Sequence, residues 1–169
     1  GQAPSPDEPE PRRGAFPAPS RAALQPGVDR VQARHGIVVV YDCHSIRSRI
    51  PFLFEGLLPV FSIGTDGGVT CAPALEQLVV KHCATAAPAM DMVLNGRFRG
   101  GWTTRHYGRP DAGIHAVQME LAQRAYLSTE AAPWAFDLSR AAVIRNILGP
   151  LLADLEQLAR SGALAARTI

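Results

Sequence analysis

The run Ile-Val-Val-Val-Tyr at positions 37–41 constrains the fold most, because four adjacent β-branched residues favour a strand over a helix. The run has no polar alternation, which is typical of a strand buried on both faces in an α/β sheet. Asp42 and His44 follow it, two positions apart, and are therefore expected on one face of the strand. Ligands of such sheets bind beyond the carboxyl ends of the strands. This strand end is the first candidate for a functional site.

The remaining pattern also indicates an α/β protein, with a mixed central sheet and flanking helices. Residues 51–68 are expected to form a loop, because prolines and glycines interrupt them repeatedly. In the strand expected at 115–121, alternation places Gln118 and Glu120 on one face. The Gly-Pro pair at 149–150 should kink or split the last helix. The expected elements are helices over about 27–34, over 73–84 and from an N-cap at Ser139, and strands over 37–41, 91–94 and 115–121.

The first 27 residues differ in composition from the rest of the chain. Seven of the 14 prolines lie there, among acidic and small residues, so the segment cannot bury enough apolar area to offset its conformational entropy. We predict that residues 1–27 form a disordered Pro-rich tail. Residues 28–169 are then expected to form one domain.

Composition excludes several classes of function. At 169 residues and 47% hydrophobic content the chain can build one core, but it has no apolar stretch of about 20 residues, so no membrane partner is expected. The net charge is +2 and the arginines are scattered, so no nucleic-acid partner is expected either. Cys43, Cys71 and Cys83 are odd in number and lack metal-binding or disulfide spacing, which favours the cytoplasm.

A second group of polar residues lies between positions 95 and 108. Glycines there permit close approach of the backbone, while Arg97, Arg99 and Arg105 carry guanidinium groups whose geometry matches a carboxylate. The segment lacks the glycine spacing of a phosphate-binding loop or a dinucleotide fingerprint. It is therefore interpreted as a loop that holds a carboxylate or an oxyanion.

Five ordered motifs, at 41–48, 64–68, 95–101, 104–108 and 115–123, resemble the C-terminal part of the N-formylglutamate amidohydrolase (N-formylglutamate deformylase) family. The resemblance covers roughly residues 28–127. It implies a zinc-carboxypeptidase-like (phosphorylase/hydrolase-like) α/β fold, incomplete at the N-terminus. It also implies metal-dependent hydrolysis of N-formyl-L-glutamate to formate and L-glutamate, a reaction of histidine degradation.

The resemblance assigns roles to individual residues. His44 matches a ligand of zinc or another divalent metal, and Glu120 matches the carboxylate that activates water. Asp42 would orient the metal site from a second shell. The expected substrate-binding residues are Arg105, Arg97 and Asn95.

The family supplies further zinc ligands from an N-terminal half whose motifs this chain lacks, so the metal site is expected to be incomplete, since a catalytic zinc takes three protein ligands. Three functions stay open. The chain is a truncated form of the hydrolase, a catalytically inactive remnant that binds a carboxylate ligand or a partner protein, or a hydrolase of a related N-acyl amino acid. An unpaired apolar edge beside residues 37–41 further predicts self-association.

Overall fold

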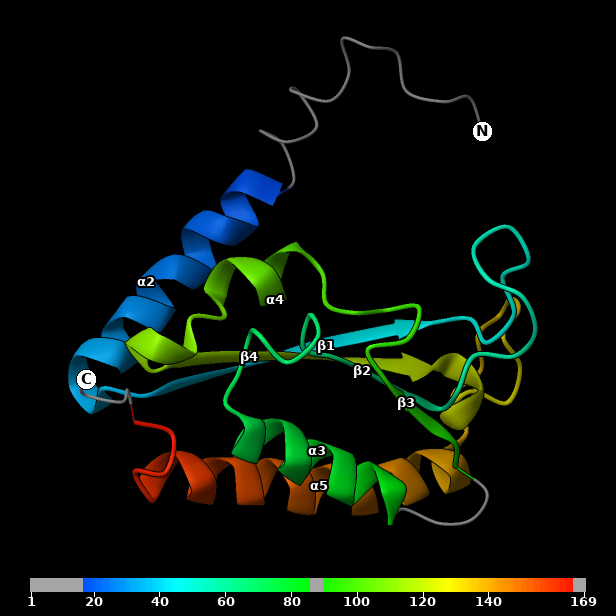
Figure 1. The fold of residues 1–169 in the computed structure, drawn as a ribbon. Helices are drawn as coiled ribbons and strands as arrows, with labels where there is room; N and C mark the ends of the chain where they lie inside the picture. Colours follow the sequence, from blue (N-terminus) through cyan, green and yellow to red (C-terminus); the bar gives the residue numbers. More distant parts are fainter. Residues whose placement is uncertain (1–16, 86–89, 166–169) are drawn as a thin grey trace, which may run out of the picture. The chain divides into compact units, whose positions relative to one another are not determined.

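A computed structural model describes residues 17–85 and 90–165 of the chain. The chain divides into two compact units, Gly1–Gly36 and Ile37–Ile169. The first contains the helix α2 (Pro17–His35), and the second contains a four-stranded sheet with its helices (Figure 1).

The helix α2 is longer than the sequence predicted. It runs through Pro26, so the expectation of a short helix over 27–34 is wrong at its start, and residues 17–27 of the predicted tail are helical. An internal proline removes a single backbone donor. The Gln25 amide donates to Asp29 Oδ1 at 2.7 Å, one turn further on, and so bridges the interruption. Residues 1–16 of the predicted tail lie outside the described residues.

The second unit contains a mixed sheet in the order β1-β4-β2-β3, which confirms the predicted fold class. Strands β1 and β4 are parallel, as are β2 and β3, whereas β2 and β4 are antiparallel. The elements are the strands β1 (Val38–Ile46), β2 (Phe61–Gly64), β3 (Met92–Leu94) and β4 (Ile114–Ala122), the helices α3 (Pro73–Ala84), α4 (Trp102–Tyr107) and α5 (Leu138–Arg160), and the 3₁₀ turns η1 (Pro110–Ala112) and η2 (Gln123–Ala125).

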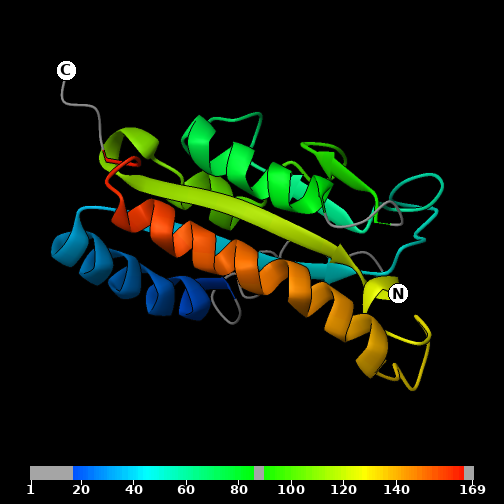
Figure 2. The same cartoon turned by 90° about the horizontal axis from the view of Figure 1, so that it is seen from below.

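The hydrophobic core lies between one face of this sheet and the helices α3 and α5. The two helices contact each other and lie on the same side of the sheet (Figures 1 and 2). Helix α3 has the predicted bounds, and it buries Leu75, Val79 and Cys83, which recur at helical spacing. The other main core residues come from the strands and from α5, namely Phe61, Ile63, Val117, Met119, Ile144, Leu151 and Leu155.

The strand β1 is less buried than expected. Among the described residues it pairs with β4 alone, so it is an edge strand, and most of its residues are half-buried or exposed. The expectation of a strand buried on both faces is therefore wrong. An apolar run shows that a segment prefers a strand, but it does not show how many neighbours that strand has.

Four further predictions needed correction. Strand β2, whose four residues are all buried, lies inside the expected loop over 51–68, and α4 lies inside the expected loop over 95–108. Helix α5 has its N-cap at Asp137, which accepts from the backbone N–H groups of Ser139 and Arg140, so Ser139 is not the cap. This helix continues through Pro150 without splitting. Strand β4 and, within one residue, β3 are confirmed.

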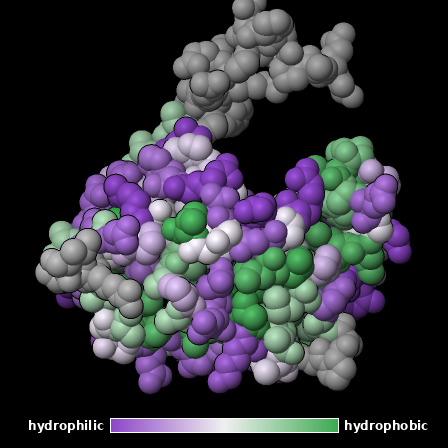
Figure 3. Space-filling model, viewed as in Figure 1, coloured by the Kyte–Doolittle hydropathy of each residue, from purple (hydrophilic) through white to green (hydrophobic). Residues whose placement is uncertain are grey.

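Exposed apolar side chains gather over loop 48–58, which is green at the upper right of Figure 3. Phe52 in this loop is 87% exposed and Leu57 is 45% exposed. Within the described parts of the chain, the search for a helix of membrane-spanning length and hydropathy found none.

Candidate active site

Polar residues of β1, β4 and β2 form two adjacent rows across one face of the sheet. In the first row His44 is paired with Glu120, which is paired with Ser62. In the second row Asp42 is paired with Gln118, which is paired with Gly64. Alternation along a strand places both rows on the face opposite Val117 and Met119, the residues that pack on α3 and α5. The sheet thus separates its apolar core from a polar face.

Asp42 and His44 are in contact on this face, as their spacing predicted. The Nε2 atom of His44 lies 3.1 Å from Oδ1 of Asp42. The second carboxylate oxygen of Asp42, Oδ2, is buried and has no hydrogen-bond partner. The His44 side chain is 47% exposed and the Asp42 side chain 17%, so the imidazole is the more accessible of the two. A carboxylate that fixes one ring nitrogen orients the other one, which is how imidazole ligands of metals are held.

Glu120 is the buried member of the same group. It is 5% exposed, and its Oε2 accepts only a long hydrogen bond of 3.4 Å, from Nε2 of Gln118. Burial raises the pKa of the Glu120 carboxyl; the neighbouring His44 and the Gln118 hydrogen bond lower it, and Asp42 raises it further. A carboxylate with a raised pKa is a better proton acceptor than an exposed glutamate.

The glycine-rich loop, residues 95–101, lies against the second row. The backbone N–H of Gly101 donates to Oε1 of Gln118 at 2.6 Å. Gly64 lies so close to Gly100 that a Cβ atom added to Gly64 would be 2.5 Å from the backbone nitrogen of Gly100. Helix α4 follows this loop and packs on β4 and β1. Its Arg105 side chain donates to the carbonyl of Gly100. The arginine is therefore held beside the loop that borders the polar face.

The other two predicted substrate-binding residues are engaged elsewhere. The amide of Asn95 accepts from the Thr65 backbone N–H at 2.9 Å and donates to Thr65 Oγ1 at 2.8 Å, and this hydroxyl in turn donates to Glu76 at 2.5 Å. Arg97 is exposed, and its Nε donates to the carbonyl of Leu53 at 3.0 Å. The structure thus brings Asp42, His44 and Glu120 together, whereas Asn95 and Arg97 fasten loops.

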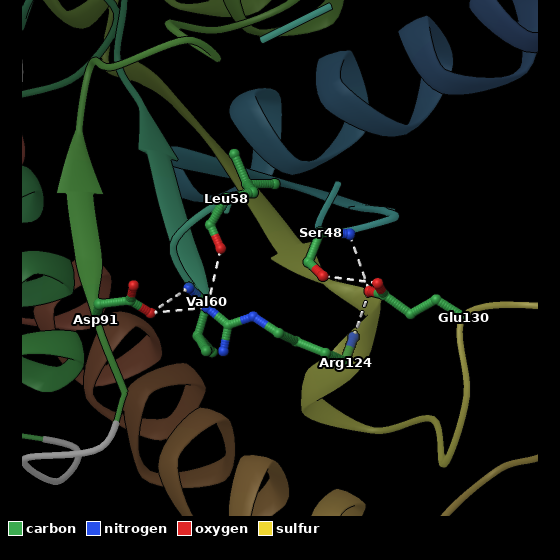
Figure 4. A network of polar contacts seen from close by, with 6 residues as sticks. All are labelled: Ser48, Leu58, Val60, Asp91, Arg124 and Glu130. Atoms are coloured by element: carbon green, nitrogen blue, oxygen red, sulfur yellow. Dashed lines mark hydrogen bonds and ion pairs between the residues drawn. The ribbon is translucent and has the colours of Figure 1, made fainter. Parts of the chain in front are cut away.

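A further polar network, which the sequence did not reveal, anchors the segments around the carboxyl ends of β1 and β4 (Figure 4). Glu130 accepts from the backbone and hydroxyl of Ser48 at 2.9 and 2.6 Å and from the Arg124 backbone at 2.7 Å. The Arg124 guanidinium donates to the carbonyl of Leu58 at 2.9 Å and to Asp91 at 3.0 Å. Loop 48–58 is therefore tied at both ends, beside the strand end that carries His44.

The described residues do not by themselves fit a catalytic zinc. Such a zinc takes three protein ligands, and within residues 17–85 and 90–165 no group of three or more His, Cys, Asp or Glu side chains is arranged to hold a metal ion. The group offers one accessible imidazole, that of His44, with a carboxylate partner.

A cavity of about 640 Å³ lies near the opposite end of β4. It is lined by His115, by the start of α3 and by residues 163–165, and none of the predicted site residues reaches it. Both ring nitrogens of His115 are used internally, since Nδ1 accepts from the Ala72 backbone N–H at 3.0 Å and Nε2 lies 2.9 Å from the Leu164 carbonyl. The polar face at the other end of β4 is therefore the better candidate for chemistry.

Strand β1 continues to Ile46, so Asp42 and His44 lie within the strand and not beyond an end at Tyr41 as expected. An imidazole and two carboxylates on one face of the parallel strands β1 and β4 form an arrangement suited to hydrolysis. Comparison with known families agrees, because residues 1–127 match the model of the N-formylglutamate amidohydrolase family. The chain belongs to this family. The match begins at residue 1, so it extends further than the resemblance over 28–127 suggested, and it includes the Pro-rich segment.

Individual relatives support the same family. The chain is 45% identical over 157 residues to N-formylglutamate deformylase of Pseudomonas aeruginosa, an alignment that covers 90% of this chain and 58% of that protein. It is 44% identical over 138 residues to the N-formylglutamate deformylase of Pseudomonas putida, and this alignment covers 80% of this chain and 51% of that protein. The chain thus spans between half and three-fifths of the length of these relatives.

The fold is also shared with a solved structure. The crystal structure of N-formylglutamate amidohydrolase from Ralstonia eutropha JMP134 superposes with a TM-score of 0.72 at 22% sequence identity. The match covers 90% of this chain and 56% of that chain. It confirms the α/β fold with a mixed sheet and flanking helices.

Proposed function

We propose that the polar face of the sheet hydrolyses the formyl amide of N-formyl-L-glutamate to formate and L-glutamate, with Glu120 as the general base. The observation that carries this proposal is the pairing of Glu120 with His44 across β4 and β1. It places a buried carboxyl of raised pKa beside an accessible imidazole that Asp42 orients. The deformylase relatives carry the substrate in their names.

The reaction needs one group that moves a proton twice. Glu120 accepts a proton from water as the water oxygen attacks the formyl carbon. The same carboxyl then returns this proton to the amide nitrogen as the carbon–nitrogen bond breaks, so that formate and the free amine of glutamate leave. Burial of Glu120 excludes bulk water from the proton transfer.

Substrate recognition follows from the charges of N-formyl-L-glutamate, which carries two carboxylates. Arg105 is the proposed cationic partner, because it lies on α4 beside the loop that borders the polar face. Arg97 and Asn95 contribute by fastening loops, through Leu53 and Thr65. His44 would supply one ligand of a divalent metal, zinc by the family resemblance, and the described residues do not complete its ligand set.

The proposal is tested by formate release from N-formyl-L-glutamate, measured with the purified chain and added zinc. Glu120→Gln is expected to lower kcat by a factor of about 10² to 10⁴, the usual contribution of a general base. The exposed Glu55→Gln is the matched control and is expected to retain the activity. Equal rates for the wild type and Glu120→Gln would contradict the role of Glu120.

A catalytically inactive chain that binds a carboxylate ligand is the second candidate, because no described group of side chains completes a metal site. It predicts that N-formyl-L-glutamate binds, and that Arg105→Ala weakens this binding, without formate release from the wild type. Formate release from the wild type that is lost in Glu120→Gln excludes this candidate.

A further inference from the structure

Among the described residues, two buried atoms on the polar face of the sheet lack a hydrogen-bond partner. One is Asp42 Oδ2, and the other is the hydroxyl of Ser62, a residue that is only 1% exposed. A buried hydroxyl without a partner destabilises the fold, so a folded protein rarely keeps one without a reason. Ser62 lies in β2.

The sheet register places Ser62 directly opposite Glu120. Strands β2 and β4 are antiparallel, and Ser62 is paired with Glu120 in that ladder. Side chains paired in this way lie on one face with their Cβ atoms about 4.5–5.5 Å apart. Glu120 is paired with His44 on its other side, so the carboxylate lies between the imidazole on β1 and the hydroxyl on β2.

The carboxylate of Glu120 also lacks donors. Among the described residues, the hydrogen bond that it accepts from Gln118 is long, at 3.4 Å. An ionised carboxylate can accept about four hydrogen bonds, and in a buried position each missing donor disfavours the charged form. Ser62 has an unused donor facing this carboxylate. Where two facing polar groups do not bond directly, one ordered water can bridge them.

We propose that Ser62 is a positioning residue of this site, which holds the Glu120 carboxylate from the β2 side through a hydrogen bond, made directly or through one ordered water. This inference rests on the proposed function of Glu120. The Ser62 hydroxyl donates toward one carboxylate oxygen and fixes the plane of the carboxylate. The other oxygen is thereby directed toward His44, on the β1 side of Glu120, where the reacting water is expected.

The first test does not depend on activity. The side-chain carboxyl ¹³C signal of Glu120 is recorded at pH 7 in glutamate-labelled protein and is identified by its absence in Glu120→Gln. Ser62→Ala removes the donor and is expected to shift this signal, whereas Ser62→Thr keeps the hydroxyl and is expected to restore it. Ser45→Ala is the matched control, because Ser45 lies one position beyond His44, on the opposite face of β1, where it contacts Tyr126. An unchanged Glu120 signal in Ser62→Ala would overturn the inference.

The second test separates a positioning role from a general loss of stability. Ser62→Ala is expected to lower kcat for formate release about tenfold, as the loss of one hydrogen bond to a charged group does, with KM unchanged. Ser62→Thr should recover most of kcat. A rise in KM with unchanged kcat would contradict positioning. If the wild type releases no formate but Ser62→Ala still shifts the Glu120 signal, the proposed reaction fails while the contact between Ser62 and Glu120 stands.

Discussion

Glu120 is the residue at which the requirements of stability and of chemistry oppose each other. Its burial raises the pKa of the carboxyl, so the folded protein binds a proton there more tightly than the unfolded chain does. Stability contributed by such a group is fully present below the unfolded pKa, about 4.3 for glutamate, and is lost as the pH rises through the folded value. The raised pKa of Glu120 therefore makes the fold less stable at neutral pH than at a pH below the unfolded pKa.

This linkage predicts that Glu120→Gln raises the thermal midpoint at pH 7–8, because glutamine fills the same space without ionising. The gain should disappear near pH 4, where the wild-type carboxyl is protonated. Thermal unfolding of both proteins across this range measures the difference, and Glu55→Gln controls for the change in net charge. A variant that is less stable than the wild type at pH 7 would contradict the destabilising role of the buried carboxylate.

His115 presents the opposite case. Burial lowers the pKa of its imidazole, which the hydrogen bond to Leu164 partly offsets, and its Nδ1 must stay unprotonated to accept from the Ala72 backbone. The folded state therefore binds fewer protons than the unfolded chain. The stability it contributes is present above the unfolded pKa, about 6.5, and is lost as the pH falls through the lowered folded value.

We accordingly expect His115→Ala to lower the free energy of unfolding at pH 7.5 by about 2–4 kcal/mol, because it removes two internal hydrogen bonds and leaves a cavity. Urea unfolding at pH 7.5 and at pH 5 measures this cost. The difference between wild type and variant should shrink at the lower pH, since the wild type then loses the stability that His115 provides. A constant difference at both pH values would argue against the assigned protonation state.

Among the elements, both helices and strands were predicted unevenly. Helix α3 was found because Pro73 opens it and Leu75, Val79 and Cys83 recur on one stripe. Strand β2 was missed because all four of its residues are buried, so no alternation marks it, and its last residue is a glycine. Ser62 was missed with it. The edge position of β1 agrees with the unpaired edge expected beside residues 37–41, whereas the order of the other strands could not be predicted, because strand order depends on contacts distant in sequence.

The packing of α5 on the sheet is tested by two neighbouring leucines. Leu151 is fully buried in the core, whereas Leu152 is 47% exposed. Leu151→Ala is expected to cost about 2–5 kcal/mol of stability, the usual range for a buried leucine. Leu152→Ala, the matched control, should stay within about 0.5 kcal/mol of the wild type. Denaturant unfolding measures both, and equal costs would contradict the assigned orientation of the helix.

At the scale of the whole molecule, the sequence predicted the family and the fold class. It also predicted that Asp42 and His44, which are in contact, lie on one face of a strand, because alternation in a strand is a local property. It could not show that the amide of Asn95 is used by Thr65, since that contact joins residues 30 positions apart. The three cysteines are free thiols, and the cytoplasmic location stays a prediction.

Among the described residues, one edge of β1 has no neighbouring strand, as the prediction of self-association requires. Unpaired backbone groups at a sheet edge pair readily with another chain, and a lysine placed there opposes such pairing. We propose that the purified chain associates through β1 with rising concentration, and that Cys43→Lys, at an exposed position of this strand, reduces the association. Cys43→Ser is the control that also removes disulfide formation. A monodisperse monomer in light scattering at high concentration would contradict this proposal.

The most direct test of the account is the location of the bound substrate. A ¹⁵N-labelled chain is titrated with N-formyl-L-glutamate in the presence of zinc, and amide chemical shifts are mapped onto the sequence. Binding at the polar face predicts shifts confined to this face and its border, at residues 42–46, 62–64, 98–106 and 118–122. Shifts confined to residues 110–115 and 163–165, around the distant cavity, or no shifts at all, would contradict it.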